Sequence, residues 1–167
     1  MTIQAKPGMK IFNLRTFNSL AVILALIFID QFSKIFFINF LARQPNYQII
    51  ITPFFSIVYA WNHGVSFGLF SQYQKYSNAI FFVINSLISC YLLRSYILDE
   101  KLHKFYLLII GGAIGNVLDR VIHGAVFDFI LFHYGNYHFP VFNIADTWVT
   151  CGIAWFVIDT FFRKRDK

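Results

Sequence analysis

Four long apolar runs divide the sequence, and shorter segments that carry most of the charge separate them. The runs cover residues 17–40, 78–98, 105–121 and 146–162. A helix needs about 20 predominantly apolar residues to cross the hydrocarbon core of a bilayer. We therefore expect four transmembrane helices. The first run is longer than the ~7–15 residues of a cleavable signal peptide's apolar core, so it is predicted to remain as a span.

The segments between the runs have other patterns. Residues 47–59 are rich in β-branched and aromatic side chains and are interrupted by Pro53, which predicts short extended strands. The sequence from Trp61 to Gly64 is expected to form a turn. Residues 65–70 form an amphipathic, aromatic piece that is typical of a segment lying at a membrane surface.

Positive charge is distributed unevenly around the runs. Most of the fourteen Lys and Arg residues lie before the first run, in the segment 94–104 or after the fourth run. The exceptions are Lys34, Arg43, Lys75 and Arg120. Cytoplasmic segments of membrane proteins are enriched in Lys and Arg. We therefore expect both termini in the cytoplasm and residues 41–77 and 122–145 outside.

Composition narrows the class of protein. The chain is 57% hydrophobic and only 13% charged, whereas a soluble domain carries about 25% charged residues. A water-soluble domain is thereby excluded, and we expect residues 1–167 to form one integral membrane domain. The net charge of +6 follows the expected topology and does not form a patch for nucleic acid. We predict membrane lipid as a partner and no nucleic acid.

Neither a metal nor a cofactor is expected. Cys90 and Cys151 lie in apolar runs without a CxxC partner, so they are predicted to be small buried hydrophobes. The histidines outside the spans could approach the aspartates, but they form no HxH or HxxxH pattern. They are His63, His123, His133 and His138.

Polar residues in and beside the runs recur at helical spacing. Asp30 and Lys34 are separated by four positions. Two further stripes are Asn116, Asp119, Arg120 and His123, and Asn143, Asp146 and Thr150. Residues three or four apart share a helix face, and polar faces of spans turn away from lipid. At 1.5 Å per residue, most of these groups fall in the outer third of the bilayer.

Several of these residues have structural explanations. Asp30 and Lys34 are predicted to form an ion pair, and Asp119 is expected to be compensated by Arg120, because an unpaired buried charge is very costly. The GxxxG spacing of Gly111 and Gly115 predicts close packing against a neighbouring helix.

Asp128 and Asp146 have no such structural explanation, because neither has a sequence neighbour that neutralises it. Two carboxylates that share a water-accessible pocket can divide the work of hydrolysis. One stays protonated because burial and the second charge raise its pKa, and it donates a proton while the other activates water. Such a pair titrates as a unit, so the sequence does not assign the proton to either residue.

Five short motifs occur in one order along the chain. They are DQFSK at 30–34, NHGVSFG at 62–68, GNVLDR at 115–120, VFD at 126–128 and FNIAD at 142–146. Together they resemble the lipoprotein signal peptidase family, also called signal peptidase II, in order and spacing. The resemblance covers roughly residues 17–162.

This resemblance implies a monomeric aspartic endopeptidase of the bacterial inner membrane. Such an enzyme removes the signal peptide of a diacylglyceryl-modified prolipoprotein by cutting immediately before the lipidated cysteine. The implied fold is an all-α membrane protein with four transmembrane helices, a small extracytoplasmic β-cradle and an interfacial helical segment. No metal or other cofactor is implied.

The resemblance also implies roles for particular residues. Asp128 and Asp146 would be the catalytic pair. Substrate-binding or orienting residues would be Asn62, Asn116, Arg120 and Asn143. Supporting residues would be Asp30, Lys34, Gly64 and Asp119. Many family members have two alanines where this chain has Val65 and Ser66, which affects the expected shape of the pocket.

Three other functions fit the sequence less well. A small ion-coupled transporter or channel would distribute charged groups through the bilayer depth, whereas here most lie in one outer layer. A non-catalytic assembly subunit held by GxxxG packing would have no use for two separate outer aspartates. A serine protease is disfavoured because there is no GxSG motif, and Ser33 and Lys34 point apart on a helix.

Overall fold

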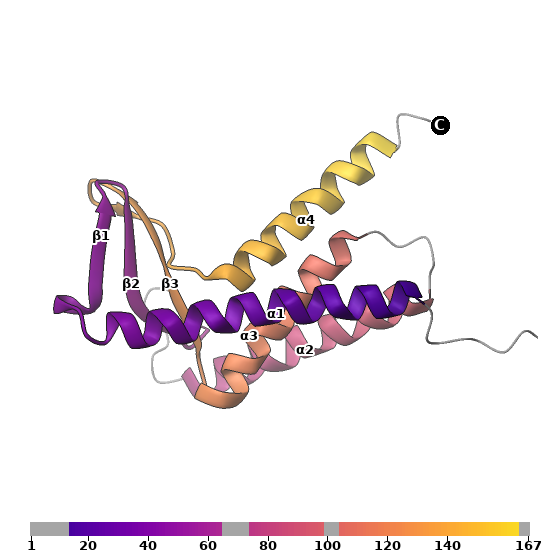
Figure 1. Ribbon diagram of the computed structural model, residues 1–167, viewed down its shortest axis with the longest axis horizontal. Helices are drawn as coiled ribbons and strands as arrows, with labels where there is room; N and C mark the ends of the chain where they lie inside the picture. The colour runs from indigo at the N-terminus through magenta and orange to yellow at the C-terminus, as the bar shows by residue number, and fades with distance from the viewer. Residues whose placement is uncertain (1–13, 65–73, 99–103, 164–167) are drawn as a thin grey trace, which may run out of the picture.

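The computed structural model describes residues 14–64, 74–98 and 104–163, which form four long helices and a small sheet (Figure 1). The helices are α1 (Leu14–Leu41), α2 (Gln74–Leu98), α3 (Phe105–His123) and α4 (Ile144–Arg163). They coincide with the four apolar runs, and each is long and apolar enough to cross a membrane. That each helix crosses the membrane stays a prediction.

Helix α3 is central to the packing of the helices. Its buried residues Leu107 and Ile110 form an apolar cluster with Ile23 of α1 and Tyr96 of α2. A Cβ at Gly111 would lie 2.9 Å from the Leu26 side chain of α1. Close packing of α3 through its glycines is therefore confirmed.

Some side chains expected inside the helix bundle lie on its outer surface. Cys90 on α2 and Cys151 on α4 are both exposed and free, so the prediction that they are buried is wrong. His123 and Thr150, which were expected to continue the two polar stripes, are also exposed. The physical reason is that apolar residues cover every face of a membrane helix, so helical spacing alone does not show where the inward face ends.

The sheet joins the two segments that were expected outside the membrane. It contains the antiparallel strands β1, β2, β3 and β4 in that order. Their bounds are β1 Gln48–Thr52, β2 Phe55–Asn62, β3 Val126–Tyr134 and β4 Tyr137–His138, and a short 3₁₀ helix, η1 (Pro45–Tyr47), precedes them. The predicted strands around Pro53 are therefore confirmed, because Pro53 lies between β1 and β2.

The predicted turn from Trp61 to Gly64 is wrong for its first two residues. Strand β2 continues through Asn62, because Trp61 and Asn62 pair with Phe127 and Val126 of β3. The chain bends only at Gly64. Sequence neighbours gave no sign of this pairing, which joins residues more than sixty positions apart. The predicted interfacial piece 65–70 lies outside the described residues.

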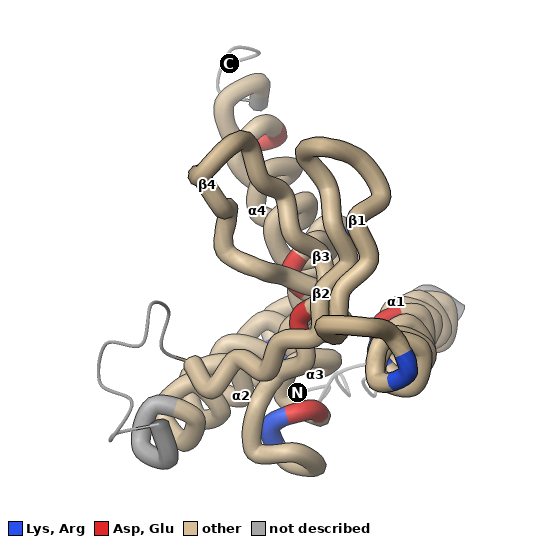
Figure 2. Tube along the Cα trace, turned by 90° about the vertical axis from the view of Figure 1, so that its left-hand side faces the viewer, with Lys and Arg blue, Asp and Glu red and all other residues tan. Residues whose placement is uncertain are grey.

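The sheet is attached to the end of α1 by an apolar cluster. Leu41, at the last position of α1, is buried with Ile57 of β2 and with Phe127 and Phe129 of β3. The Phe37 ring stacks on Phe129 with 4.5 Å between centroids. The tube in Figure 2 is tan over most of its length, so the described chain has few acidic and basic positions.

Candidate active site

A short connection positions Asp128 above the end of α3. The helix stops at Gly124, whose φ of 71° is in the left-handed region and whose N–H donates to the Arg120 carbonyl oxygen at 3.1 Å. After Ala125 the chain enters β3. The Oδ2 atom of Asp119 accepts the N–H of Phe127 at 3.1 Å. Because Asp128 is the next residue, a carboxylate of α3 fixes the strand that carries it.

A reciprocal cap positions Asp146 at the start of α4. Asn143 precedes the helix, and its Oδ1 accepts the Asp146 N–H at 2.9 Å. The Oδ2 atom of Asp146 accepts the Asn143 N–H at 3.2 Å. This is the arrangement of a capping box. The Ala145 N–H donates to Asp30 Oδ1 of α1 at 2.9 Å, so a second carboxylate fixes the backbone next to Asp146.

Asn143 links the two candidate catalytic residues. The chain before it returns along β3, where Ile130 and Phe142 exchange backbone hydrogen bonds of 2.9 and 3.1 Å. This pairing brings Asn143 Nδ2 to 2.7 Å from Asp128 Oδ1. The side chain of Asn143 therefore binds Asp128 while its backbone binds Asp146.

The second oxygen of Asp128 is bound from β2. Asn62 Nδ2 donates to Asp128 Oδ2 at 3.0 Å, and Asn62 Oδ1 accepts the Gly64 N–H at 2.8 Å. Gly64 has a φ of 92°, which L-residues rarely adopt. A Cβ at this position would also meet the Phe81 ring of α2. Gly64 thus allows the bend that orients the Asn62 amide toward Asp128.

Asn116 of α3 binds the other carboxylate. Its Nδ2 donates to Asp146 Oδ1 at 2.7 Å. Its Oδ1 accepts from Lys34 Nζ and from Asn143 Nδ2, both at 3.1 Å. The two amides, Asn116 and Asn143, therefore connect both aspartates to each other and to a lysine of α1.

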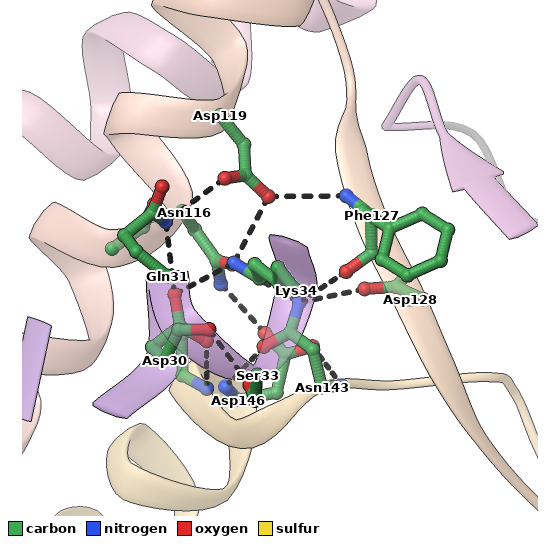
Figure 3. A network of polar contacts seen from close by, with 12 residues as sticks. Asp30, Gln31, Ser33, Lys34, Asn116, Asp119, Phe127, Asp128, Asn143 and Asp146 are labelled. Carbon is green, nitrogen blue, oxygen red and sulfur yellow. Dashed lines mark hydrogen bonds and ion pairs between the residues drawn. The ribbon is translucent and has the colours of Figure 1, made fainter. Parts of the chain in front are cut away.

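Lys34 lies in the middle of this network, in a buried ionic cluster (Figure 3). Its Nζ is 2.8 Å from Asp30 Oδ2 and 2.9 Å from Asp119 Oδ2. The expected ion pair of Asp30 with Lys34 is confirmed. The expected compensation of Asp119 by Arg120 is corrected, because the ion pair of Asp119 is with Lys34 on another helix.

Gln31 was not singled out from the sequence. Its Nε2 donates to Asp30 Oδ2 at 3.1 Å and to Asp119 Oδ1 at 2.9 Å, so it joins the two carboxylates that form ion pairs with Lys34. A polar residue next to Asp30 inside an apolar run was the available signal.

Arg120 lies beside the site with unused hydrogen-bonding capacity. Its Nη1 donates to the Asn116 carbonyl oxygen at 3.3 Å, and its Cζ is 5.7 Å from the centre of the Phe81 ring. Its Nε is buried and has no hydrogen-bond partner among the described residues. The negative charges of Asp146 and Asp128 act on this guanidinium.

Burial and charge both act on Asp128, which is 2% exposed. Desolvation, followed by the nearby charge of Asp146, raises the pKa of Asp128 to about 7, against the opposing hydrogen bonds from Asn62 and Asn143. A carboxyl group in this state holds a proton in mildly acidic solution and exchanges it near neutral pH. That is the property required of a general acid.

The predicted site residues therefore come together from five elements, α1, β2, α3, β3 and α4. Asn62, Asp128, Asp146, Asn116 and Asn143 are directly hydrogen-bonded to one another, and Asp30, Lys34 and Asp119 lie behind them. Within the described residues, no group of three or more His, Cys, Asp or Glu side chains could hold a metal ion. Val65 and Ser66 lie outside the described residues.

Two solved structures have the same architecture. Both are titled as bacterial membrane enzyme structures obtained by the in meso method, at 2.3 and 1.9 Å resolution. The first matches with a TM-score of 0.74 at 28% identity, covering 90% of this chain and 91% of the other. The second has a TM-score of 0.70 at 29% identity, covering 92% and 97%. The fold and the four apolar helices define a multi-pass bacterial membrane protein.

The sequence comparisons assign it to one family. The profile described as Signal peptidase (SPase) II matches residues 22–162. The lipoprotein signal peptidase of Rickettsia felis is 47% identical over 150 residues, which cover 89% of this chain and 76% of that protein. The one from Rickettsia akari is 48% identical over 144 residues, covering 85% and 74%.

The chain belongs to the signal peptidase II family. It is accordingly a peptidase of lipoprotein processing, and the resemblance stated from the five motifs is confirmed. The comparisons give no support to the transporter or channel alternative.

Proposed function

We propose that this chain is an aspartic endopeptidase that cleaves diacylglyceryl-modified prolipoproteins immediately before the lipidated cysteine. Asp128 and Asp146 are its catalytic pair. The observation that carries the proposal is that one residue, Asn143, donates hydrogen bonds to both carboxyl groups, from its side chain to Asp128 on β3 and from its backbone N–H to Asp146 on α4.

The pair performs hydrolysis by exchanging protons. The ionised carboxylate takes a proton from water, and the resulting hydroxide oxygen bonds to the scissile carbonyl carbon. The protonated carboxyl gives its proton to the carbonyl oxygen, which forms a tetrahedral diol. As the diol collapses, the group that is now a carboxylate takes a proton from one hydroxyl, and the other, now a carboxyl, gives its proton to the leaving nitrogen. The C–N bond breaks and leaves a free amine on the cysteine and a carboxylic acid on the signal peptide, which then ionises in water.

The remaining polar groups orient the reactants. Asn116 and Asn143 hold the pair by the hydrogen bonds described above. Arg120 offers its Nε–H, which has no partner among the described residues, to a carbonyl oxygen of the substrate backbone. Asn62 donates a hydrogen bond to Asp128 Oδ2 and so orients that carboxyl group.

The lipid attachment explains where the site lies. Acyl chains and an apolar signal helix both prefer the bilayer, so the scissile bond is held near the interface. Asp128 lies in β3 and Asp146 in the first turn of α4. Figure 1 shows that the chain after β3 leads into the start of α4 beside the sheet, at the end that the positive-inside rule assigns to the outer face. We propose that both termini are cytoplasmic and that the enzyme acts as a monomer.

The test is cleavage of a purified prolipoprotein peptide by the protein in detergent or lipid. Diacylglyceryl-modified peptide should be cut before the modified cysteine, and the unmodified peptide should not. Asp128→Asn and Asp146→Asn should each lower the single-turnover rate at least about a hundredfold, the lower end of the usual contribution of one acid–base group. Asp159→Asn, near the other end of α4, is the matched control.

Two results would contradict this proposal. Either dyad variant retaining more than about a hundredth of the wild-type rate would remove that residue from the pair, and Asp119 would be tested next. Loss of wild-type activity in a chelator would indicate a metal-dependent reaction in place of an aspartic one.

A further inference from the structure

Three buried side-chain atoms have no hydrogen-bond partner among the described residues. They are Asn78 Oδ1 of α2, Arg120 Nε of α3 and Trp148 Nε1 of α4. A buried donor or acceptor without a partner costs free energy, so each one in a folded protein calls for an explanation. Asn78 and Arg120 lie on neighbouring helices, and one is an acceptor while the other is a donor.

Asn78 lies on the face of α2 that is turned toward α3. Positions 78, 82, 85, 89, 92 and 96 of α2 are all buried or half-buried, and their alternating spacing of four and three residues places them on one helix face. At the inner end of this face, Tyr96 packs against Leu107 and Ile110 of α3, beside which α2 lies (Figure 1). Asn78 is the outermost of these positions.

The ring of Phe81 connects this end of α2 to Arg120. Phe81 follows Asn78 by three residues, and residues three apart are neighbours on a helix surface. The Cζ atom of Arg120 lies 5.7 Å from the centre of the Phe81 ring. A Cβ at Gly64 would lie 2.5 Å from Phe81 Cδ2, so the bend that follows β2 also packs on this ring.

These residues adjoin the proposed catalytic pair on two sides. The charges of Asp146 and Asp128 act on the guanidinium of Arg120. Asn62, just before the bend, donates to Asp128 Oδ2 at 3.0 Å. Contacts therefore lead from the pair to Arg120, then to the Phe81 ring and the outer end of α2.

The two unpartnered atoms complement the polar groups of a peptide backbone. Each residue of a peptide other than proline offers one N–H and one carbonyl oxygen. In an extended residue both groups point to the same side, which is why paired residues of antiparallel strands exchange two hydrogen bonds. Arg120 Nε is a donor that can bind a carbonyl oxygen, and Asn78 Oδ1 is an acceptor that can bind an N–H.

We propose that Asn78 is a further substrate-binding residue. Its Oδ1 accepts a backbone N–H from the extended substrate segment beside the scissile bond, while Arg120 donates to a carbonyl oxygen of the same segment. This inference rests on the proposed endopeptidase function and adds a contact from α2 to it. Because the contact is with main-chain atoms, it places no demand on the side chains of the substrate.

Asn78→Leu removes the acceptor and keeps a side chain of similar size. A bond made equally in the ground state and the transition state affects KM and leaves kcat unchanged. The KM for the diacylglyceryl-modified peptide should therefore rise about 2- to 10-fold, the effect of one hydrogen bond. The unfolding temperature of the substrate-free protein should not fall, because the substitution removes a buried acceptor without a partner. A lower unfolding temperature with an unchanged KM would show a structural role and overturn the inference.

Asn85→Leu is the matched control. It is the same substitution on the same face of α2, about two turns closer to the inner end, and it should leave KM unchanged. An equal rise of KM in both variants would show that α2 as a whole is disturbed, which would overturn the specific contact. Asn78→Ala removes the same acceptor and should raise KM in the same way, so it decides the matter if Asn78→Leu does not fold.

Substrate peptides with a single ester link test the bond from the other side, because the ester oxygen replaces one backbone N–H. For the wild-type protein, one ester position outside the scissile bond should raise KM by about the same factor as Asn78→Leu. That ester should have no further effect on Asn78→Leu, since both changes remove one interaction. Additive effects, or the lack of such a position, would overturn the role of Asn78.

Failure of the proposed function would look different. Wild-type protein that does not cleave the modified peptide, or activity retained by Asp128→Asn, would contradict the endopeptidase proposal itself. An unchanged KM in Asn78→Leu, with the wild type active and Asp128→Asn inactive, would contradict only the role of Asn78.

Discussion

Asp128 shows how one residue's surroundings set the pH range of activity. Burial and the charge of Asp146 raise its pKa to about 7. Because the proposed mechanism needs one carboxyl group of the pair protonated, and Asp128 has the raised pKa, the rate should fall as the pH rises through about 7. Asn62 donates to the ionised form, so Asn62→Ala should raise the pKa of Asp128 further and move this alkaline limb to higher pH. The measurement is the pH profile of single-turnover cleavage.

The sign of this change separates two roles for Asn62. Movement to lower pH, or no movement, would show that Asn62 does not stabilise the Asp128 carboxylate, and that its loss acts only on substrate binding. Asn136→Ala is a suitable control, because Asn136 lies in the exposed turn between β3 and β4, away from both carboxylates.

Asp30 is expected to matter more for folding than for turnover. Asp30→Asn removes one of the two carboxylates that neutralise Lys34 and weakens the bond to the Ala145 N–H. Breaking a buried ion pair typically costs about 3–5 kcal/mol. Thermal unfolding should therefore occur at lower temperature, while the rate per folded molecule falls much less. Normal stability together with abolished turnover would place Asp30 among the catalytic residues.

At the scale of elements, the contact of α3 with α1 depends on the absence of a side chain at Gly115. A Cβ there would lie 2.6 Å from Asp30 Oδ2. Gly115→Ala should lower the free energy of unfolding by about 1–3 kcal/mol, as overpacking of a close contact does. Chemical or thermal unfolding in detergent measures this change.

Gly135 provides the comparison for Gly115. Nothing lies within 4 Å of a Cβ at Gly135, whose φ is 57°. Gly135→Asn should be nearly neutral, because asparagine tolerates the left-handed region. Equal effects of the two substitutions would show that the contact of Gly115 with Asp30 does not limit the packing.

The elements differ in how far the sequence predicts them. The apolar runs locate all four helices, and the Pro53 break separates β1 from β2. Strand β3 was not predicted, because its apolar residues lack a regular alternation and its partners lie in the other outside segment. The same long-range pairing extends β2 through Asn62. Sequence patterns describe local conformation, and they do not show which distant segments meet.

At the scale of the whole molecule, sequence patterns likewise do not show which residues of the site contact one another. The motifs contain Asn62, Asn116 and Asn143, which are hydrogen-bonded to Asp128 or Asp146, but they do not show how these residues are connected. Asp119 is next to Arg120 in sequence, yet adjacent residues on a helix point in different directions, and Lys34 reaches Asp119 from α1. Gln31 joins the network only because α1 and α3 are in contact.

Topology is the prediction that concerns the molecule as a whole. Both termini should be cytoplasmic, and residues 41–77 and 122–145 should be outside. A single cysteine at Asn136 should react with an impermeant reagent added to intact cells, and one at Asp166 should not. Cys90 and Cys151 must first be replaced, because both are exposed on the helices. Labelling of Asp166 but not Asn136 would reverse the topology.

The pairing of Asp30 with Lys34 also bears on how the protein enters the membrane. Asp119 follows these residues in the chain by more than eighty positions, so it is not yet synthesised when the first helix leaves the ribosome. An acid and a base one helical turn apart let that helix partition into lipid as a neutral unit, at a lower cost than either charge alone. The arrival of α3 then adds a second acid and a net negative charge, which the N–H groups of Gln31, Ala145 and Phe127 solvate. Because Ala145 and Asp146 lie in α4, the last helix to be made, the candidate catalytic pair can be complete only when that helix is in place.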